Sequence, residues 1–265
     1  MALIDTHCHL YLPEFNPDLE AVIERALDCG VDRMVVVGID AKTSQQAIRL
    51  AEQYQGIYAA IGIHPNSPVI DINDEMNQIK AMLSHPKVVA VGEIGLDYYR
   101  EYVAVPEQKA RLLRQLDLAA QADLPVIIHN REAIEDLYPI LSNWVKEKKN
   151  PSQPDSKFAG VLHSFSEDVQ WAQRMIDMGF LVGVSGVVTF PKARNIKEVV
   201  MTIPKTYLLI ETDAPYLSPQ NHRGKRNEPA FLAYTAQEIA KMQGCSLEVL
   251  ADVTTHNAKI LFGID

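Results

Sequence analysis

The sequence predicts one domain of the α/β class, a TIM-type (β/α)8 barrel that spans residues 1–265. Eight short apolar runs recur along the chain, and helical patterns lie between them, as a barrel of alternating strands and helices requires. An open doubly wound sheet usually carries a Gly-rich loop after its first strand, whereas Thr6-His7-Cys8-His9 follows here. The hydrophobic fraction of 47% suits a globular domain and excludes a disordered, collagen-like or coiled-coil chain.

The expected strands are near-continuous apolar runs, which are typical of strands buried on both faces of a parallel sheet. In chain order they are Ala2–Ile4, Met34–Gly38, Ile57–Ile63, Val88–Val91, Pro125–Ile128, Gly160–Leu162, Phe180–Val184 and Tyr207–Ile210. No internal repeat and no clear linker interrupts this series, so we expect a single domain.

Helical periodicity fills the gaps between these runs. Apolar residues three and four positions apart mark the first clear helix, and Pro106 stands at the first helical position of the second. Gly244 separates the last two, because glycine favours a helix end. The four clearest helices are Leu19–Leu27, Pro106–Ala122, Phe231–Met242 and Ser246–Val253. The stretch Lys146–Lys157 is expected to be a loop between the fifth and sixth strands.

The composition narrows the class of function. A net charge of −9 argues against a nucleic-acid module that binds through a broad basic face. It does not exclude an enzyme that contacts phosphates through bound cations, since a cation reverses the local electrostatics. Three cysteines cannot form a disulfide framework, and we find no secretory signal and no apolar stretch that could cross a bilayer. We therefore expect a cytoplasmic protein without a membrane partner.

Polar residues of metal-ligand type stand at the carboxyl ends of five of the expected strands. They are His7 and His9 after the first run, Glu93 after the fourth, His129 after the fifth, His163 after the sixth and Asp213 after the eighth. Because these strand ends meet on one face of a barrel, where catalytic residues gather, we expect the six side chains to lie together.

The spacing and the donor types indicate a metal centre. Residues two apart in an extended chain point the same way, so Asp5, His7 and His9 share a face and both imidazoles can reach one ion. Imidazole and carboxylate together suit Zn²⁺, Mn²⁺, Fe²⁺ or Co²⁺, and more carboxylate and water favours Mg²⁺. Six candidates allow two ions about 3.5–4 Å apart. We expect one or two divalent ions per chain, Mg²⁺, Mn²⁺ or Zn²⁺.

Seven motifs in order along the chain resemble the TatD family of metal-dependent deoxyribonucleases, within the amidohydrolase superfamily. They are Asp5-Thr6-His7-Cys8-His9-Leu10, Gly62-Ile63-His64-Pro65, Gly92-Glu93-Ile94-Gly95-Leu96-Asp97-Tyr98-Tyr99, Leu124-Pro125-Val126-Ile127-Ile128-His129-Asn130-Arg131, His163-Ser164-Phe165-Ser166, Glu211-Thr212-Asp213-Ala214-Pro215-Tyr216-Leu217 and Arg223-Gly224-Lys225-Arg226-Asn227-Glu228-Pro229. Any one motif is weak, whereas the ordered set covers nearly the whole chain. The family often has His-Cys-Phe-Ser-Gly where this chain has His163-Ser164-Phe165-Ser166-Glu167, so Glu167 adds negative charge near the expected cavity mouth.

The resemblance implies a TIM barrel whose metal ions are held by His7, His9, Glu93, His129, His163 and Asp213. It also implies hydrolysis of phosphodiester bonds in DNA, typically by 3′-to-5′ exonuclease action on single strands. We expect a metal-bound water to be the nucleophile, Glu93 to bridge two ions and Asp213 to accept the proton of the water. Asp5 is a candidate to orient a ligand imidazole.

Substrate contacts are expected around this centre. Arg131 could bind a phosphate through its guanidinium fork, and Tyr98 and Tyr99 could stack on bases, although a packing role for both is equally compatible with the sequence. His64 is compatible with a substrate contact or a structural role. Basic residues follow the seventh and eighth strands, where barrels often bind phosphate. They are Lys192, Arg194 and Lys197, then Arg223, Lys225 and Arg226.

Two other classes of function remain open from the sequence. A small-molecule amidohydrolase or phosphoesterase could use the same metal site, because a fold does not fix its substrate. A barrel that binds metal only as a structural staple is the non-enzymatic alternative, although structural zinc sites are closed by four protein ligands. DNA is the expected substrate, and no obligate protein partner is evident.

Overall fold

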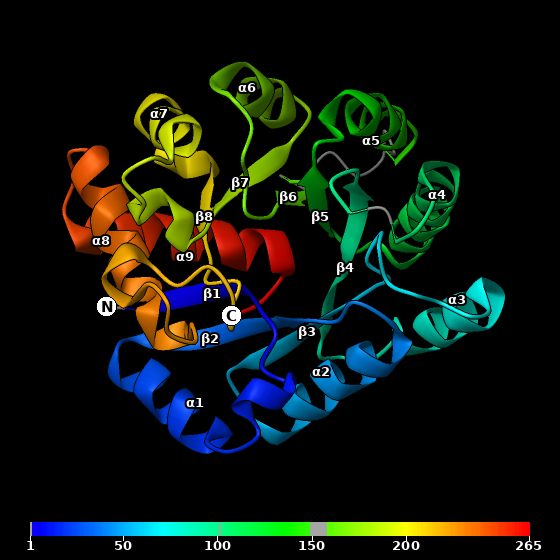
Figure 1. The fold of residues 1–265 in the computed structure, drawn as a ribbon, viewed down its shortest axis with the longest axis horizontal. Helices are drawn as coiled ribbons and strands as arrows, with labels where there is room; N and C mark the ends of the chain where they lie inside the picture. The colour runs from blue at the N-terminus through cyan, green and yellow to red at the C-terminus, as the bar shows by residue number, and fades with distance from the viewer. Residues whose placement is uncertain (1, 101, 149–157) are drawn as a thin grey trace.

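The computed structural model describes residues 2–100, 102–148 and 158–265. Eight parallel strands pair with their sequence neighbours in the order β1 to β8, and helices surround them (Figure 1). The strands are β1 Leu3–Cys8, β2 Val31–Val37, β3 Ile57–Ile61, β4 Val88–Asp97, β5 Val126–Arg131, β6 Gly160–Leu162, β7 Phe180–Val184 and β8 Leu208–Ile210. The predicted (β/α)8 barrel of one domain is the observed fold.

The helices follow the strands around the barrel. They are α1 Leu19–Asp28, α2 Ala41–Gln53, α3 Ile72–Met82, α4 Val105–Ala122, α5 Ile134–Lys148, α6 Val169–Asp177, α7 Arg194–Thr202, α8 Leu232–Met242 and α9 Leu247–Phe262. Local sequence fixes several of their ends. Asp40 accepts a hydrogen bond from the backbone of Thr43 and closes a capping box at the start of α2. Gly263 ends α9 with a φ of 62°, which glycine adopts without strain.

The ring of strands closes between β1 and the residues that follow β8. The backbone N–H of His9 donates to the carbonyl of Ala214 at 2.8 Å, and the N–H of Asp213 donates to the carbonyl of His7 at 2.8 Å. The Thr6 hydroxyl donates to Ile210. These bonds bring the first and last motifs of the chain to one place.

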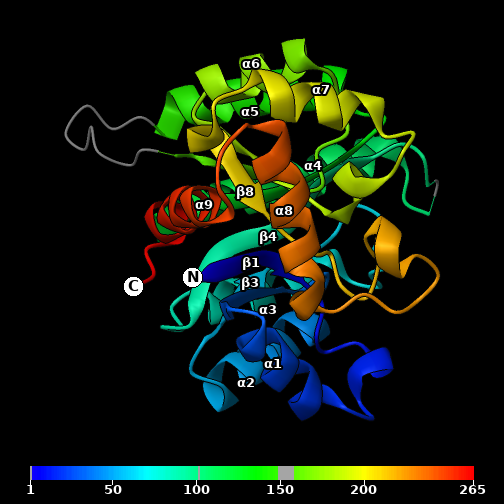
Figure 2. The ribbon, with the colours of Figure 1, turned by 90° about the vertical axis from the view of Figure 1, so that its left-hand side faces the viewer.

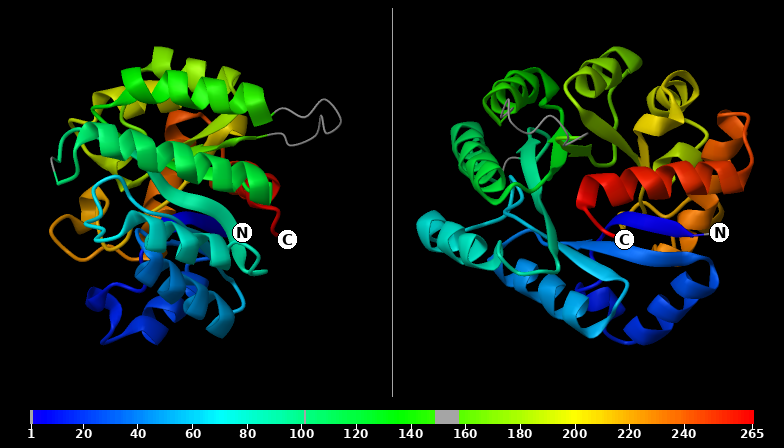
Figure 3. Two further views of the ribbon diagram at one scale, coloured as in Figure 1. Left: turned by 90° about the vertical axis from the view of Figure 1, so that its right-hand side faces the viewer. Right: turned by 180° about the vertical axis from the view of Figure 1, so that it is seen from behind.

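The barrel interior is apolar at the amino ends of the strands. Ile4, Val35, Ile127 and Leu181 are almost fully buried in one cluster, and α9 contributes further apolar side chains to it. Figure 3, from behind, shows α9 crossing this end of the barrel. The amino end is therefore a packed core that supports the site at the opposite end.

Several element boundaries differ from the sequence prediction; β2, for example, begins at Val31 instead of Met34, and β3 ends at Ile61 instead of Ile63. β1, β4 and β5 extend further, so His7, Glu93 and His129 lie within strands instead of after them. The apolar-run criterion ended each strand at its first polar residue, although inward-facing polar residues continue the strand.

Helix α9 was predicted to end at Val253 but continues to Phe262. Its polar middle is buried and satisfied, because Thr254 bonds to Leu250 and Asn257 donates to the carbonyls of Lys205 and Leu208. Within the predicted Lys146–Lys157 loop, α5 reaches Lys148, and residues 149–157 lie outside the described residues.

Candidate metal centre

The six candidate ligands converge at the carboxyl ends of the strands. Glu93 is at their centre, and its Oε1 lies 2.7 Å from Nδ1 of His129 and 2.9 Å from Nε2 of His163. Its Oε2 lies 3.5 Å from Nε2 of His7 and 3.9 Å from Nε2 of His9. Nε2 of His64 also lies 3.8 Å from Oε1, so one carboxylate from β4 contacts five imidazoles.

Asp213 completes the cluster from the segment after β8. Its Oδ1 lies 3.4 Å from Nε2 of His9 and 3.7 Å from Nε2 of His7. The backbone of Asp213 has a φ of 57°, in the left-handed region that costs a non-glycine residue on the order of 1–3 kcal/mol. The bond to the His7 carbonyl holds this conformation, which turns the carboxylate toward the histidines.

Gly95 explains how β4 and β5 approach each other closely here. The two strands pair Gly95 with His129, and a Cβ added at Gly95 would stand 1.9 Å from the carbonyl oxygen of His129. The φ of Gly95 is also 151°, which L residues rarely adopt. A glycine is therefore required next to the carboxylate of Glu93 if His129 is to reach it.

The carboxylates of the cluster are ionised and attract positive charge. Burial alone raises the pKa of Glu93, but the imidazoles of His163 and His129 outweigh it and hold that pKa well below its usual value. Burial likewise raises the pKa of Asp213, yet a hydrogen bond from His9 brings it below the usual range. Burial lowers the pKa of His163, but the Glu93 carboxylate outweighs it and raises that pKa well above its ordinary value.

The donor set fits divalent cations. One donor atom from each residue lies within 4.8 Å of the others in three groups, two of which share His7. They are His7, His9 and Asp213, then His7, His163 and Glu211, then His64, Glu93 and His129. Imidazole and carboxylate are the ligands that Zn²⁺, Mn²⁺ and related ions prefer, and the ionised carboxylates balance their charge.

Two buried carboxylates were not predicted as site residues. Asp97 lies 3.2 Å from Nε2 of His129 through its Oδ2, and Glu211 lies 3.5 Å from Nδ1 of His163 through its Oε1. Burial raises the pKa of Asp97, but the hydrogen bond from His129 outweighs it and lowers that pKa to about 2. Strand alternation could have found both, since Asp97 is four residues after Glu93 and Glu211 two before Asp213.

Asp5 does not orient a ligand ring as the sequence suggested. Its carboxylate accepts hydrogen bonds from the backbone N–H of Thr212 at 2.9 Å and from the hydroxyl of Thr212 at 2.5 Å. It also accepts from the backbone N–H of His7 at 3.3 Å. Burial raises the pKa of Asp5 to about 7. Asp5 therefore ties β1 to the end of β8 and acts on the backbone of His7.

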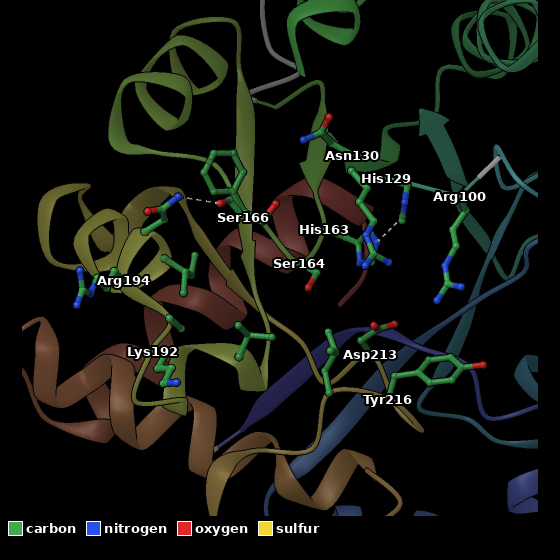
Figure 4. Close-up of a pocket in the computed structure, with 17 residues that line it drawn as sticks. Arg100, His129, Asn130, His163, Ser164, Ser166, Lys192, Arg194, Asp213 and Tyr216 are labelled. Carbon is green, nitrogen blue, oxygen red and sulfur yellow. Dashed lines mark hydrogen bonds between the residues drawn. The ribbon is translucent and has the colours of Figure 1, made fainter. Parts of the chain in front are cut away.

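A cavity of about 900 Å³ opens above the cluster. His129, His163 and Asp213 line it at the centre, between positively charged residues on two sides (Figure 4). Lys192 and Arg194 lie on one side, and Arg100 lies on the opposite side. The lining thus carries positive charge around the candidate ligands, although the whole chain has a net charge of −9.

Two of the residues predicted to contact substrate lie on the side of Arg100. Arg131 lines the cavity, and its guanidinium stacks over the ring of Tyr99 at 3.8 Å from the centroid. Tyr98 is half-buried, and its hydroxyl donates to Asp136 at 2.7 Å. The aromatic ring that packs on the Arg131 guanidinium is therefore that of Tyr99, whose side chain is exposed.

The other two residues predicted to contact substrate, His64 and Arg223, lie in different places. His64 is part of the cluster, with its Nε2 at 3.8 Å from Oε1 of Glu93, and burial lowers its pKa to about 4. Arg223 lies over the ring of Phe190 at 4.5 Å from the centroid. Its contact is with the loop after β7, and Arg223 is not among the residues that line the cavity.

A family model described as "TatD related DNase" matches residues 4–263. The chain belongs to the TatD family. It is 42% identical to an uncharacterised metal-dependent hydrolase, YabD, of Bacillus subtilis, over 99% of this chain and 100% of that protein. It is 36% identical to a protein of Pantoea ananatis named 3′-5′ ssDNA/RNA exonuclease TatD, over 99% of this chain and 100% of that protein.

The fold agrees with that of a solved TatD homologue. The crystal structure of YjjV from Escherichia coli K12 superimposes with a TM-score of 0.90 at 34% identity, over 99% of this chain and 98% of that one. The protein is thus a metal-dependent hydrolase of the TatD family. Within the described residues of this TatD chain, no helix combines the length and apolarity that a membrane span needs.

Proposed function

We propose that this protein is a metal-dependent deoxyribonuclease that removes nucleotides from the 3′ end of single-stranded DNA. The observation that carries the proposal is the cavity, in which the candidate ligands lie between positively charged side chains on two sides. A strand with phosphates on both sides of the cleaved bond complements this distribution of charge. The name of the Pantoea ananatis relative supports the same class of reaction.

His7, His9, Glu93, His129, His163 and Asp213 would hold one or two divalent ions, with Glu93 shared between them. Bound divalent ions lower the pKa of a water to about 7 and neutralise charge on a phosphoryl group. Asp213 is present as the unprotonated carboxylate, because, against the effect of burial, the hydrogen bond from His9 holds its pKa below the usual range, and its Oδ1 faces the cluster, where it would accept the proton. Arg131, Lys192 and Arg194 orient the phosphates of the strand by charge.

The test is a single-stranded oligonucleotide labelled at its 3′ end, incubated separately with Mg²⁺, Mn²⁺ and Zn²⁺. We expect immediate release of the label by the wild type, no release after chelation, and strong loss with Asp213→Asn. A matched 5′-labelled strand should shorten progressively from its far end. Retention of the label with all three ions would contradict the proposal.

The small-molecule alternative is tested in the same assay. A chromogenic phosphodiester that carries no nucleotide reports hydrolysis by the metal centre without a DNA strand. Turnover of this compound together with an intact oligonucleotide would favour a small-molecule phosphoesterase. A metal staple is excluded if chelation removes activity while the circular dichroism spectrum of the barrel stays unchanged.

A further inference from the structure

Glu211 is a buried carboxylate that the reaction proposed above does not use. It follows β8 directly and has no exposed surface. Its Oε1 accepts a hydrogen bond from the backbone N–H of Ser164 at 2.5 Å, whereas its Oε2 has no hydrogen-bond partner among the described residues. A carboxylate is removed from water at a large cost unless other groups compensate it, so its presence here needs a physical reason.

Two imidazole nitrogens of the cluster also lack hydrogen-bond partners among the described residues. They are Nδ1 of His7 and Nδ1 of His163. One ring nitrogen of each histidine and one oxygen of Glu211 all lie within 4.8 Å of one another, and Nδ1 of His163 is 3.5 Å from Oε1. The two rings stack at 4.0 Å between centroids with 14° between their planes. A carboxylate oxygen without a partner therefore lies beside a parallel pair of rings, each of which has an unpartnered Nδ1.

The opposite nitrogens of the same rings face the metal centre. Nε2 of His163 lies 2.9 Å from Glu93, and Nε2 of His7 lies 3.5 Å from it. A histidine that binds a cation through Nε2 carries its proton on Nδ1, and an oxygen acceptor at Nδ1 fixes that tautomer. The other two ligand histidines have an oxygen acceptor at the nitrogen that points away from Glu93, since Nδ1 of His9 lies 2.8 Å from the Val37 carbonyl and Nε2 of His129 lies 3.2 Å from Asp97.

The neighbouring strand leaves room for the Glu211 carboxylate. A Cβ added at Gly183, in β7, would stand 2.6 Å from Oε2 of Glu211. Any larger residue at this position would have to displace the carboxylate or the strand. The position of Glu211 behind the rings is thus built into two strands of the barrel.

We propose that Glu211 is a positioning residue for the metal centre. It accepts hydrogen bonds from Nδ1 of His163 and, across the stacked pair, orients His7, so that both rings present an unprotonated Nε2 to the cations. The inference rests on the proposed metal centre. It adds one carboxylate that lies beside two ligand histidines, His7 and His163. Asp97, by contrast, contacts only His129 among the ligand histidines.

The decisive variant is Glu211→Gln, which keeps the size of the side chain and the oxygen that Ser164 uses. The amide N–H₂ takes the place of Oε2, and the retained oxygen carries no charge, so the Nδ1–H of His163 keeps only a weaker, neutral acceptor. We expect affinity for Zn²⁺, measured by competition with a chelating dye, to fall about 10–100-fold. In the Zn²⁺-loaded protein, the downfield Nδ1–H proton signal of His163 should move upfield and exchange faster with solvent, as expected when a charged acceptor becomes a neutral one.

Two further variants separate positioning from a structural role. Glu211→Asp keeps the charge and should restore part of the affinity, and Asp97→Asn should change the signal of His129 while that of His163 remains. If Glu211→Gln fails to fold, the Glu211→Asp affinity and NMR signal carry the test. A variant with wild-type affinity, or with lost affinity but an unchanged His163 signal, overturns the assignment. A wild type that binds neither Zn²⁺ nor Mn²⁺ overturns the metal centre itself.

Discussion

The two ends of the barrel are built on the same strands from opposite kinds of residue. At the amino end, Leu261 and Phe262 of α9 pack on apolar strand residues such as Ile4. At the carboxyl end, the same strands carry buried histidines and carboxylates, and Asp213 has a strained backbone. Buried ionisable groups weaken a fold unless they are paired, whereas buried apolar groups stabilise it. Stability and chemistry are therefore separated along the strand axis.

The sharpest way to break the carboxyl end alone is Glu93→Gln. The substitution removes the charge that five imidazoles share. We expect the rate of label release to fall by more than about a hundredfold, because even outer partners of metal ligands cost 10–100-fold when they are lost. Circular dichroism should show a folded barrel. A Glu93→Gln enzyme with wild-type rate would contradict the central position of this carboxylate.

The matching change at the amino end is Phe262→Ala. This side chain is 4% exposed, and its loss leaves a cavity, so the free energy of unfolding should fall by about 3–5 kcal/mol. The activity of the folded fraction should be unchanged. Urea unfolding measures the first quantity, and Phe262→Leu, which keeps much of the volume, is the control. Equal damage to activity and stability would show that the two ends are not separable.

A smaller effect tests the side of the cavity that is lined by Lys192 and Arg194. Arg194 and Lys197 are both on α7, but Arg194 lines the cavity and Lys197 does not. Arg194→Gln should weaken binding of single-stranded DNA and reduce the slope of log affinity against log salt by about 0.7, as for one phosphate contact. Lys197→Gln should leave the slope unchanged. Equal slopes for both variants would remove Arg194 from the proposed strand path.

The smallest expected effect concerns an ion pair between loops at the carboxyl end. Hydrogen bonds from Arg226 and Arg25 lower the pKa of Asp18 to about 2. Because this folded-state pKa is depressed, the pair stabilises the fold above the unfolded pKa near 4, and the contribution is lost as pH falls toward 2. Asp18→Asn should therefore be less stable than wild type near pH 5, with a gap that narrows near pH 3. Urea midpoints at the two pH values measure the gap, and a constant gap would contradict the assignment.

The sequence predicted the barrel because apolar runs alternate with amphipathic helical patterns. The strands and the apolar faces of the helices can be buried only against one another. It also predicted six residues that the structure brings into one cluster. It could not end β4 correctly, since Glu93 faces inward within a strand whose Gly95 reads as a break. The extent of α9 was underestimated because the partners of Asn257, the carbonyls of Lys205 and Leu208, are distant in sequence.

The residues that support the cluster were harder to predict than the cluster itself. Asp97 and Glu211 stand inside motifs that were recognised, but their roles depend on which ring nitrogen each one faces. The side-chain environment decided between Tyr98 and Tyr99 in the same way, since one is bonded to Asp136 and the other is exposed beside Arg131. The sequence pattern identifies the candidate metal ligands, whereas the residues that hydrogen-bond to those ligands can be identified only from the folded structure.

The closure of the barrel by α9 has a practical consequence for handling the enzyme. Thr255 of α9 bonds to Ala2 at the start of β1, and both ends of the chain lie on the same side of the molecule (Figure 2). That side is remote from the strand ends that carry the cavity. A purification tag or a solid support attached at either terminus would therefore leave the mouth of the cavity facing the solution, free to receive a long polymer.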